Sequence, residues 1–217
     1  MSAPDGVGPP TEGAAASRAV LTLLADVLDL AATVFSRPGA DQRSRASELV
    51  RERSFAFPGG RELATSVRAL AGAEAADLDV EYVRLFLHGR SATAHPYESF
   101  YRTGLLMDPA CLDELGALFA SAGVAPAEDG VSPDHLGVEA AFLALLLRGL
   151  STATGDADAV LAAIAWDLLE AHLLPFASAF RERLAGLVPD CYFASGADAL
   201  AYALRAASVP LRPVVPV

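Results

Sequence analysis

The sequence contains no lysine, and all 16 basic side chains among its 217 residues are arginines. This absence excludes the phosphate-binding lysine of a P-loop, a Schiff-base lysine and a lysine general base. The glycine-rich pattern G-x-G-x-x-G that follows a strand in dinucleotide-binding folds is missing as well. We therefore expect no nucleotide fold of the common kinds.

Cysteine is scarce, with only Cys111 and Cys191, eighty positions apart and outside any C-x-x-C pattern. Two such residues predict neither a disulfide framework nor a metal-ligand set. We expect two ordinary thiols that are mostly buried. No cofactor is indicated by these residues.

Long apolar runs are also absent. The richest stretch, residues 136–147, is interrupted by Gly137 and Glu139, so no uninterrupted run approaches the roughly 18 residues that a membrane span needs. The first 16 residues are rich in Gly and Pro, and they have neither a basic start nor an apolar core of a secretory signal. We expect a cytoplasmic protein without stable membrane insertion.

Aromatic residues make up only 7% of the chain, and the β-branched clusters of a sheet are few, whereas alanine is abundant. Apolar residues recur at the 3–4 spacing of helices. This pattern predicts a single all-α domain of about nine or ten helices over residues 17–207, after a disordered lead-in over 1–16 and before a Pro-rich, non-helical tail over 208–217. The expected helices span residues 17–35, 41–53, 61–71, 77–87, 108–122, 133–150, 156–172, 176–187 and 195–207.

Local signals place the boundaries of these helices. Asp108-Pro109 and Ser132-Pro133 each pair an N-cap residue with proline at the first helical position. Pro175 is expected to break or kink its helix, and Ser195 resembles the start of a capping box. Residues 90–104 lack helical periodicity and are predicted to form a loop.

The net charge of −11 is unevenly distributed. Residues 74–139 carry twelve acidic side chains and three arginines, whereas residues 1–73 carry eight of each. Binding of nucleic acid needs a basic face, so this distribution argues against it. An acidic surface that only keeps the protein soluble is one interpretation, and an acidic surface for a cationic partner is the other.

Two constellations with catalytic chemistry have weak support. His135 and Glu139 are four residues apart on one helix face, but a metal site needs three or four ligands and no second pair stands at ligand spacing. Ser99 has Glu98 and His95 nearby in sequence and His135 further along, yet no G-x-S-x-G elbow supports a nucleophile. We therefore expect a binding protein rather than an enzyme.

Two segments are more specific, namely EYVRLFLHGRSATAHPYESFY (residues 81–101) and SPDHLGVEAAFLALL (residues 132–146). In this order they resemble the TorD/DmsD family of redox-enzyme maturation chaperones, and more distantly NarJ. A weaker match is EAHLLPFASAFRERL, which begins at Glu170. Departures from the family pattern include His88-Gly89-Arg90 after the Leu-Phe element, where the family often has Gly-Pro.

The resemblance implies an all-helical chaperone without a cofactor. It would bind the N-terminal, often twin-arginine, signal peptide and the catalytic subunit of a molybdopterin oxidoreductase until the client's cofactor is inserted. Asp134 and Glu98 would meet arginine, and His135 would lie at the rim of the groove. The residues implied in peptide binding are Leu85, Phe86, Pro96, Tyr97, Glu98, Ser99, Tyr101, Asp134, His135 and Glu139.

Two other functions remain open at this stage. A NarJ-type chaperone would assemble a molybdoenzyme subunit that is not exported, and a nucleotide-hydrolysing helper would need a phosphate-binding loop that the sequence does not display. Either a monomer or a homodimer is compatible with the sequence.

Overall fold

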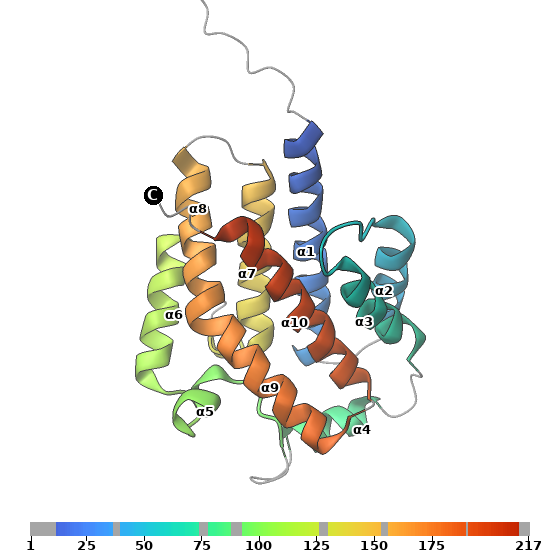
Figure 1. Ribbon diagram of the computed structural model, residues 1–217. Coiled ribbons are helices and arrows are strands. Elements are labelled where there is room, and N and C mark those ends of the chain that lie inside the picture. The colour runs from blue at the N-terminus through green and yellow to red at the C-terminus, as the bar shows by residue number, and fades with distance from the viewer. Residues whose placement is uncertain are drawn as a thin grey trace, which may run out of the picture.

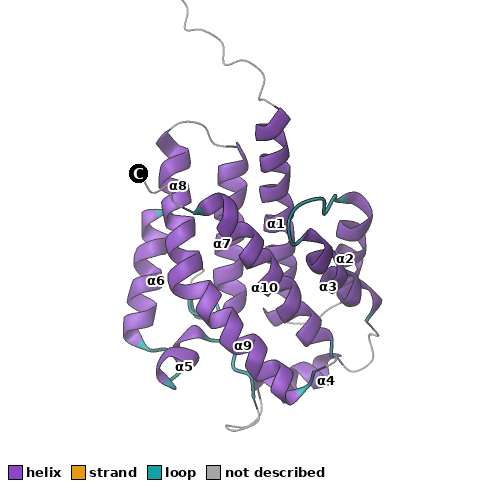
Figure 2. Ribbon diagram, in the orientation of Figure 1, coloured by secondary structure: helices purple, strands orange, loops and turns teal. Residues whose placement is uncertain are grey.

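Helices make up most of the chain that the computed structural model describes, which is residues 12–36, 40–73, 78–87, 93–125, 130–152, 156–189 and 191–212 (Figures 1 and 2). In chain order the helices are α1 (Glu12–Ser36), α2 (Ala40–Glu52), α3 (Gly60–Gly72), α4 (Leu78–Tyr82) continued by π-helical η1 (Val83–Leu87), α5 (Glu98–Thr103), α6 (Pro109–Ser121), α7 (Leu136–Thr152), α8 (Asp156–Asp167) continued by π-helical η2 (Leu168–Leu173) and α9 (Leu174–Leu187), and α10 (Tyr192–Leu211). Within these described ranges there are nine continuous helical segments and no strand, which confirms the predicted all-α domain.

Helix α1 lies at the centre, packed against α7 and α10, with α2 and α3 on one side and α6 and α8 on the other (Figure 1). Its inward residues, such as Leu24, Leu28 and Phe35, are completely buried, as the apolar spacing of this segment predicts. Glycines allow close approach at both contacts: a Cβ on Gly137 of α7 would lie 2.7 Å from Ser36 Oγ, and one on Gly196 of α10 would lie 2.8 Å from a methyl of Val34.

The prediction that residues 90–104 form only a loop is wrong for Glu98–Thr103, which form α5. Proline restricts the residue before it, so Pro96 constrains His95 but does not prevent a helix from beginning two residues later. Helix α5 ends at Gly104, whose positive φ of 77° suits glycine. Residues 90–92 of the predicted loop lie outside the described residues.

The predicted starts of two helices are also wrong. Helix α7 begins at Leu136 instead of Pro133, because residues 133–134 form a turn. Helix α10 begins at Tyr192, with Cys191 Sγ accepting from the backbone N–H of Ala194, so Ser195 lies inside the helix. By contrast, Asp108 caps α6 as predicted, accepting from the N–H groups of Ala110 and Cys111.

Both ends of the helical domain extend beyond the predicted bounds. Helix α1 begins at Glu12, and residues 1–11 of the predicted lead-in lie outside the described residues. Helix α10 continues through Pro210 to Leu211, so the prediction that this part of the tail is not helical is wrong. A proline in the last turn removes only one backbone hydrogen bond, and the helix can still complete that turn.

Pro175 bends its helix, as predicted, without interrupting it. The chain passes through η2, where the N–H of Leu174 bonds to the carbonyl of Leu169, five residues earlier. This wider turn lets the chain accommodate the missing N–H of proline, and Figure 1 shows α9 continuing from α8 at an angle.

Two helical stretches, Ser17–Ser36 and Asp158–Leu187, are long and apolar enough on average to cross a membrane, although neither is an uninterrupted apolar run. In the first, 56% of the most apolar window is buried inside the protein, because α1 is the central core helix. Length and composition therefore do not separate a spanning helix from a core helix here.

Candidate functional site

A short antiparallel β-bridge joins the two segments that carry the family resemblance. The backbone N–H of Glu98 donates to the carbonyl of Asp134 at 2.8 Å, and the N–H of Leu136 donates to the carbonyl of Pro96 at 2.9 Å. These bonds bring the start of α5, at Glu98, against the start of α7, at Leu136, although 38 positions separate these two residues in the chain.

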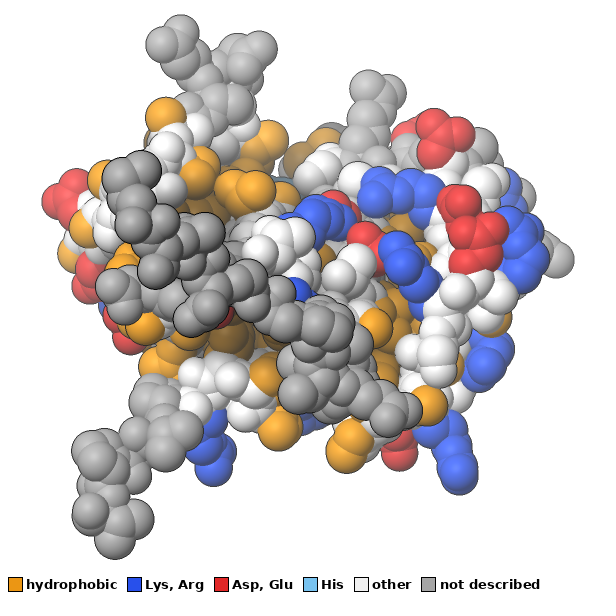
Figure 3. Space-filling view, turned by 90° about the horizontal axis from the view of Figure 1, so that it is seen from above, with side chains coloured by type: hydrophobic (Ala, Val, Ile, Leu, Met, Phe, Trp, Pro, Cys, Tyr) orange, Lys and Arg blue, Asp and Glu red, His pale blue; other side chains and the backbone are white. Residues whose placement is uncertain are grey.

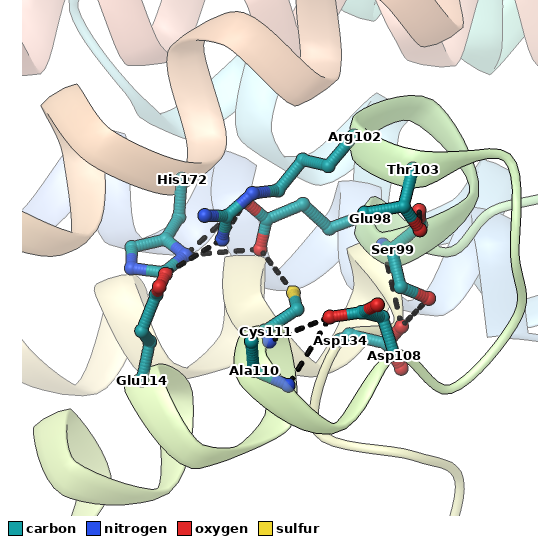
Figure 4. Close-up of polar contacts among 10 residues, drawn as sticks. All are labelled: Glu98, Ser99, Arg102, Thr103, Asp108, Ala110, Cys111, Glu114, Asp134 and His172. Carbon is teal, nitrogen blue, oxygen red and sulfur yellow. Dashed lines mark hydrogen bonds and ion pairs between the residues drawn. The ribbon is translucent and has the colours of Figure 1, made fainter.

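Ser99 and Asp134 form the buried polar contact beside this bridge. Both side chains are completely buried, and the Ser99 hydroxyl donates to Asp134 Oδ2 (Figure 4). The same hydroxyl oxygen accepts from the backbone N–H of Met107 at 3.0 Å. Ser99 therefore connects the start of α7 to the loop between α5 and α6, and its proton is bonded to a carboxylate rather than to a histidine base.

Glu98 lies at the centre of a second buried network (Figure 4). Its carboxylate is 2.9 Å from His172 Nδ1, accepts from Cys111 Sγ at 3.3 Å and lies 3.5 Å from the guanidinium of Arg102. Arg102 also donates to Glu114 at 2.7 Å. Burial raises the pKa of the Cys111 thiol, and the Glu98 carboxylate raises it further, so the sulfur remains a protonated donor.

Glu139 lies in α7, one turn after the bridge, and it is completely buried. Neither of its side-chain oxygens has a hydrogen-bond partner among the described residues, and the same is true of Asp134 Oδ1. Burial, followed by the nearby carboxylates of Glu98 and Asp134, raises the pKa of Glu139 well above its usual value. The protonated, neutral form of Glu139 is thus favoured, because a negative charge on Glu139 would lie beside the carboxylates of Glu98 and Asp134 without a hydrogen-bond donor to stabilise it.

His135 caps α7 from inside the protein. Its Nδ1 accepts from the backbone N–H of Gly137 at 3.0 Å, and its ring contacts Tyr97 edge-on at 5.1 Å. Burial lowers the pKa of His135 to about 4, so it is neutral at pH 7. The prediction that His135 lies at the rim is wrong, because only 3% of the residue is exposed.

The residues predicted to form an apolar lining are mostly part of the core. Leu85 and Phe86 are buried, and Phe86 packs against Phe180 and Phe193. Pro96 is buried too, whereas Tyr97 and Tyr101 are half-buried. Contact of these side chains with a peptide stays a prediction, and their contacts in this structure are internal.

The family described as nitrate reductase delta subunit matches residues 55–182, which is more than half of the chain. The chain belongs to this family. It is a family of NarJ/TorD-like maturation chaperones, so the family resemblance of the two segments is confirmed. A crystal structure of a putative redox enzyme maturation protein from Archaeoglobus fulgidus is similar at 23% identity, covering 84% of this chain and 99% of that chain with a TM-score of 0.43. No curated protein matches.

In this member of the delta-subunit family, sequence reasoning missed three participants in the buried network. His172, Cys111 and Arg102 all contact Glu98, although they come from η2, α6 and α5. The His-Leu-Leu-Pro match at residues 172–175 was the one available signal for His172. Among the described residues, no group of three or more His, Cys, Asp or Glu side chains has an arrangement that could hold a metal ion.

Sequence reasoning also missed an exposed apolar loop formed by Leu105, Leu106 and Met107, which we call the LLM loop. These side chains are 64%, 50% and 61% exposed. Met107 has a left-handed φ of 58°, which strains a residue other than glycine. Three apolar residues directly before the helix-capping pair Asp108-Pro109 were the signal that could have revealed this loop.

A groove of about 460 Å³ lies between α1, α6 and α7. On α7 its lining starts at Gly137, two positions after His135 of the β-bridge. Most of the lining is apolar: Ala32, Thr33, Ser36, Phe119, Val124, Ala125, Gly137, Val138, Ala141, Phe142 and Leu145. The stacked rings of Phe119 and Phe142, 4.1 Å apart, are almost completely buried, whereas Leu145 is half exposed. The family chaperone therefore has two apolar surface features near the buried polar networks.

Proposed function

We propose that this protein is a cytoplasmic maturation chaperone that binds the N-terminal segment of a molybdopterin-dependent oxidoreductase before the enzyme is complete. The client segment would combine positive charge, in the manner of a twin-arginine signal, with an apolar stretch. The chaperone acts by binding and release and not by catalysis. Membership of the delta-subunit family supports the client class.

The observation that carries the proposal is the combination of carboxylates and exposed apolar side chains on one side of the molecule. Residues 93–147, which include α5, α6 and the first part of α7, carry eight acidic residues and only one arginine. Asp113 and Glu114 of α6 are exposed, whereas Glu98, Asp134 and Glu139 are buried. That arginine, Arg102, is already paired with Glu98 and Glu114. The LLM loop and Leu145 expose apolar surface in the same part of the chain. A cationic and apolar peptide complements this surface in both respects.

The buried residues of the site have a structural part in this function. Asp134 and Glu98, which sequence reasoning assigned to client arginines, bond within the protein, so in this conformation they shape the surface. Direct contact with a client arginine would need the β-bridge to open. We therefore propose that they hold α5, α6 and α7 in the binding arrangement.

Calorimetric titration tests the proposal. The titrant is a synthetic N-terminal peptide of the molybdoenzyme encoded nearest to this gene, and matched peptides carry twin lysine or a scrambled order. We expect a Kd of about 1 μM, corresponding to roughly −8 kcal/mol. Binding should weaken with salt, with scrambling and with lysine, because lysine does not form the paired hydrogen bonds of a guanidinium.

The family description favours one second candidate, a NarJ-type chaperone of a subunit that is not exported. Its client would have no twin-arginine signal. If the peptide fails to bind while a full-length molybdoenzyme subunit co-purifies with the chaperone, this candidate replaces the first. If neither binds, both proposals are wrong.

A further inference from the structure

We infer that the LLM loop is the surface that docks the apolar stretch of the client's N-terminal segment, and that Ser99 positions this loop from inside the protein. The inference rests on the proposed function and assigns it to particular residues. Leu105, Leu106 and Met107 are three successive large apolar side chains, and each is at least half exposed, which is unusual. Single exposed apolar residues are ordinary on a protein surface, whereas contiguous ones mark binding sites.

The backbone holds this loop in one conformation. Gly104 and Met107 both have positive φ, 77° and 58°. The N–H of Leu105 bonds to Thr103 Oγ1 at 3.3 Å, and Asp108 begins α6 directly after the loop. Left-handed backbone at a methionine is retained only where the surroundings impose it, and such strain concentrates at functional sites.

Ser99 is the group that imposes it. Its hydroxyl oxygen accepts from the N–H of Met107, while its proton is donated to the buried Asp134 carboxylate. A β-bridge fixes Asp134 against α5. The Ser and Asp of the two signature segments thus determine the position of the exposed loop without being exposed themselves. This indirect role explains why Ser99 and Asp134, which belong to the signature segments of a binding family, are completely buried in this protein.

The chemistry around the loop selects a cationic apolar segment as its occupant. Asp108 follows the loop directly, and α6 adds Asp113 and Glu114 on its exposed surface. The one arginine of this region, Arg102, is neutralised by Glu98 and Glu114. An anionic membrane surface would be repelled by these carboxylates, whereas arginines flanking an apolar stretch would be attracted.

The decisive variant is Leu105→Ser/Leu106→Ser/Met107→Asn, measured by calorimetry with the twin-arginine peptide described above. Asparagine tolerates a left-handed φ, so the loop backbone is retained. We expect the Kd to rise about tenfold or more, since burial of three apolar side chains on binding is lost. The control is Val80→Ser/Val160→Ser/Val209→Ser, which removes three similarly exposed side chains from α4, α8 and α10 and should change the Kd less than about twofold.

A second pair of variants tests the positioning role. Ser99→Ala should weaken peptide binding in the wild-type protein, but it should have no further effect on the Kd when the LLM loop already carries the three polar substitutions. A purely structural role for Ser99 would weaken binding equally in both backgrounds. Thermal unfolding of every variant establishes that it is folded at the temperature of the titration.

The other outcomes overturn the inference in distinguishable ways. If the loop variant binds the peptide normally and Leu145→Ser does not, the occupant lies in the α1/α6/α7 groove, and the proposed function stands without the loop. If the loop variant abolishes only self-association in sedimentation, the loop is a dimer contact. If the wild-type protein fails to bind the peptide, the proposed function itself is wrong.

Discussion

The side of the molecule formed by α5, α6 and the start of α7 differs sharply from the side formed by α2 and α3. Residues 40–73, which form α2 and α3, carry six arginines and four acids, and in the view from above arginine side chains gather on that side (Figure 3). Ion pairs there, such as Arg51–Glu52, are exposed to solvent. Residues 93–147 carry eight acids and one arginine, and three of those acids, Glu98, Asp134 and Glu139, are buried.

The two sides show that the same residue type has different consequences in different surroundings. An exposed carboxylate on α2 is solvated whether or not it is paired, so it contributes to solubility and little to stability. A buried carboxylate must be hydrogen-bonded or protonated. Where it is hydrogen-bonded, as Glu98 is to His172 and Cys111, it fixes the donors around it. On the α5–α7 side, the buried carboxylate of Asp134 is therefore connected through Ser99 to the exposed LLM loop. The exposed carboxylates of α2 have no comparable effect on the surface around them.

The largest expected effect comes from removing the buried carboxylate of Glu98. Glu98→Ala should lower the free energy of unfolding by about 3–5 kcal/mol, because Arg102, His172 and Cys111 lose their common acceptor. The matched change on the other side, Glu52→Ala, should cost no more than about 0.5 kcal/mol. Urea unfolding at pH 7 measures both. If Glu98→Ala and Glu52→Ala lower the free energy of unfolding equally, burial of the carboxylate does not distinguish the two sides.

A pH dependence of similar size should come from His135. Its folded-state pKa is lowered to about 4 by burial, so it contributes stability that is present above its unfolded pKa of 6.5 and is lost as the pH falls toward 4. Relative to His135→Asn, which retains a cap for α7, the wild type should lose about 3 kcal/mol between pH 7 and pH 4. Urea midpoints at several pH values in this range measure the difference.

Residues 40–73 contain no histidine, so the α2–α3 side has no group of this type that could cause a comparable loss of unfolding free energy between pH 7 and pH 4. Parallel pH profiles of the wild type and the variant would mean that the His135 ring becomes accessible to protons without unfolding.

A smaller effect is expected where α7 approaches α1. Gly137→Ala should destabilise the protein by about 1–3 kcal/mol, since the new Cβ would lie 2.7 Å from Ser36 Oγ and 2.8 Å from the carbonyl of Ala32. It should also widen the groove beside these residues.

The smallest effect has the opposite sign. Gly116→Ala places a Cβ in open space in the middle of α6, so it should stabilise the protein by up to about 1 kcal/mol. Thermal melting of the two alanine variants side by side measures both changes. Destabilisation by Gly116→Ala would show that α6 has contacts beyond those of the described residues.

Much of the fold could be predicted from sequence because its signals are local. The apolar spacing of α1 and the Asp108-Pro109 start of α6 depend on neighbours along the chain, and both are confirmed. Short α5 and the late start of α7 were missed for the opposite reason. Their boundaries depend on the β-bridge between Tyr97 and His135, two residues 38 positions apart, and no local pattern encodes that pairing.

The sequence by itself determined that this chain is helical, acidic in its middle third and a member of a chaperone family, because composition, periodicity and motif order are properties of the chain. Only the tertiary structure decided where the motif residues lie and what they contact. Glu98, Ser99 and Asp134 read equally well as surface contacts or as buried supports, since polarity alone does not specify exposure. Packing of α5, α6, α7 and η2 around them places them inside and leaves Leu105, Leu106 and Met107 outside.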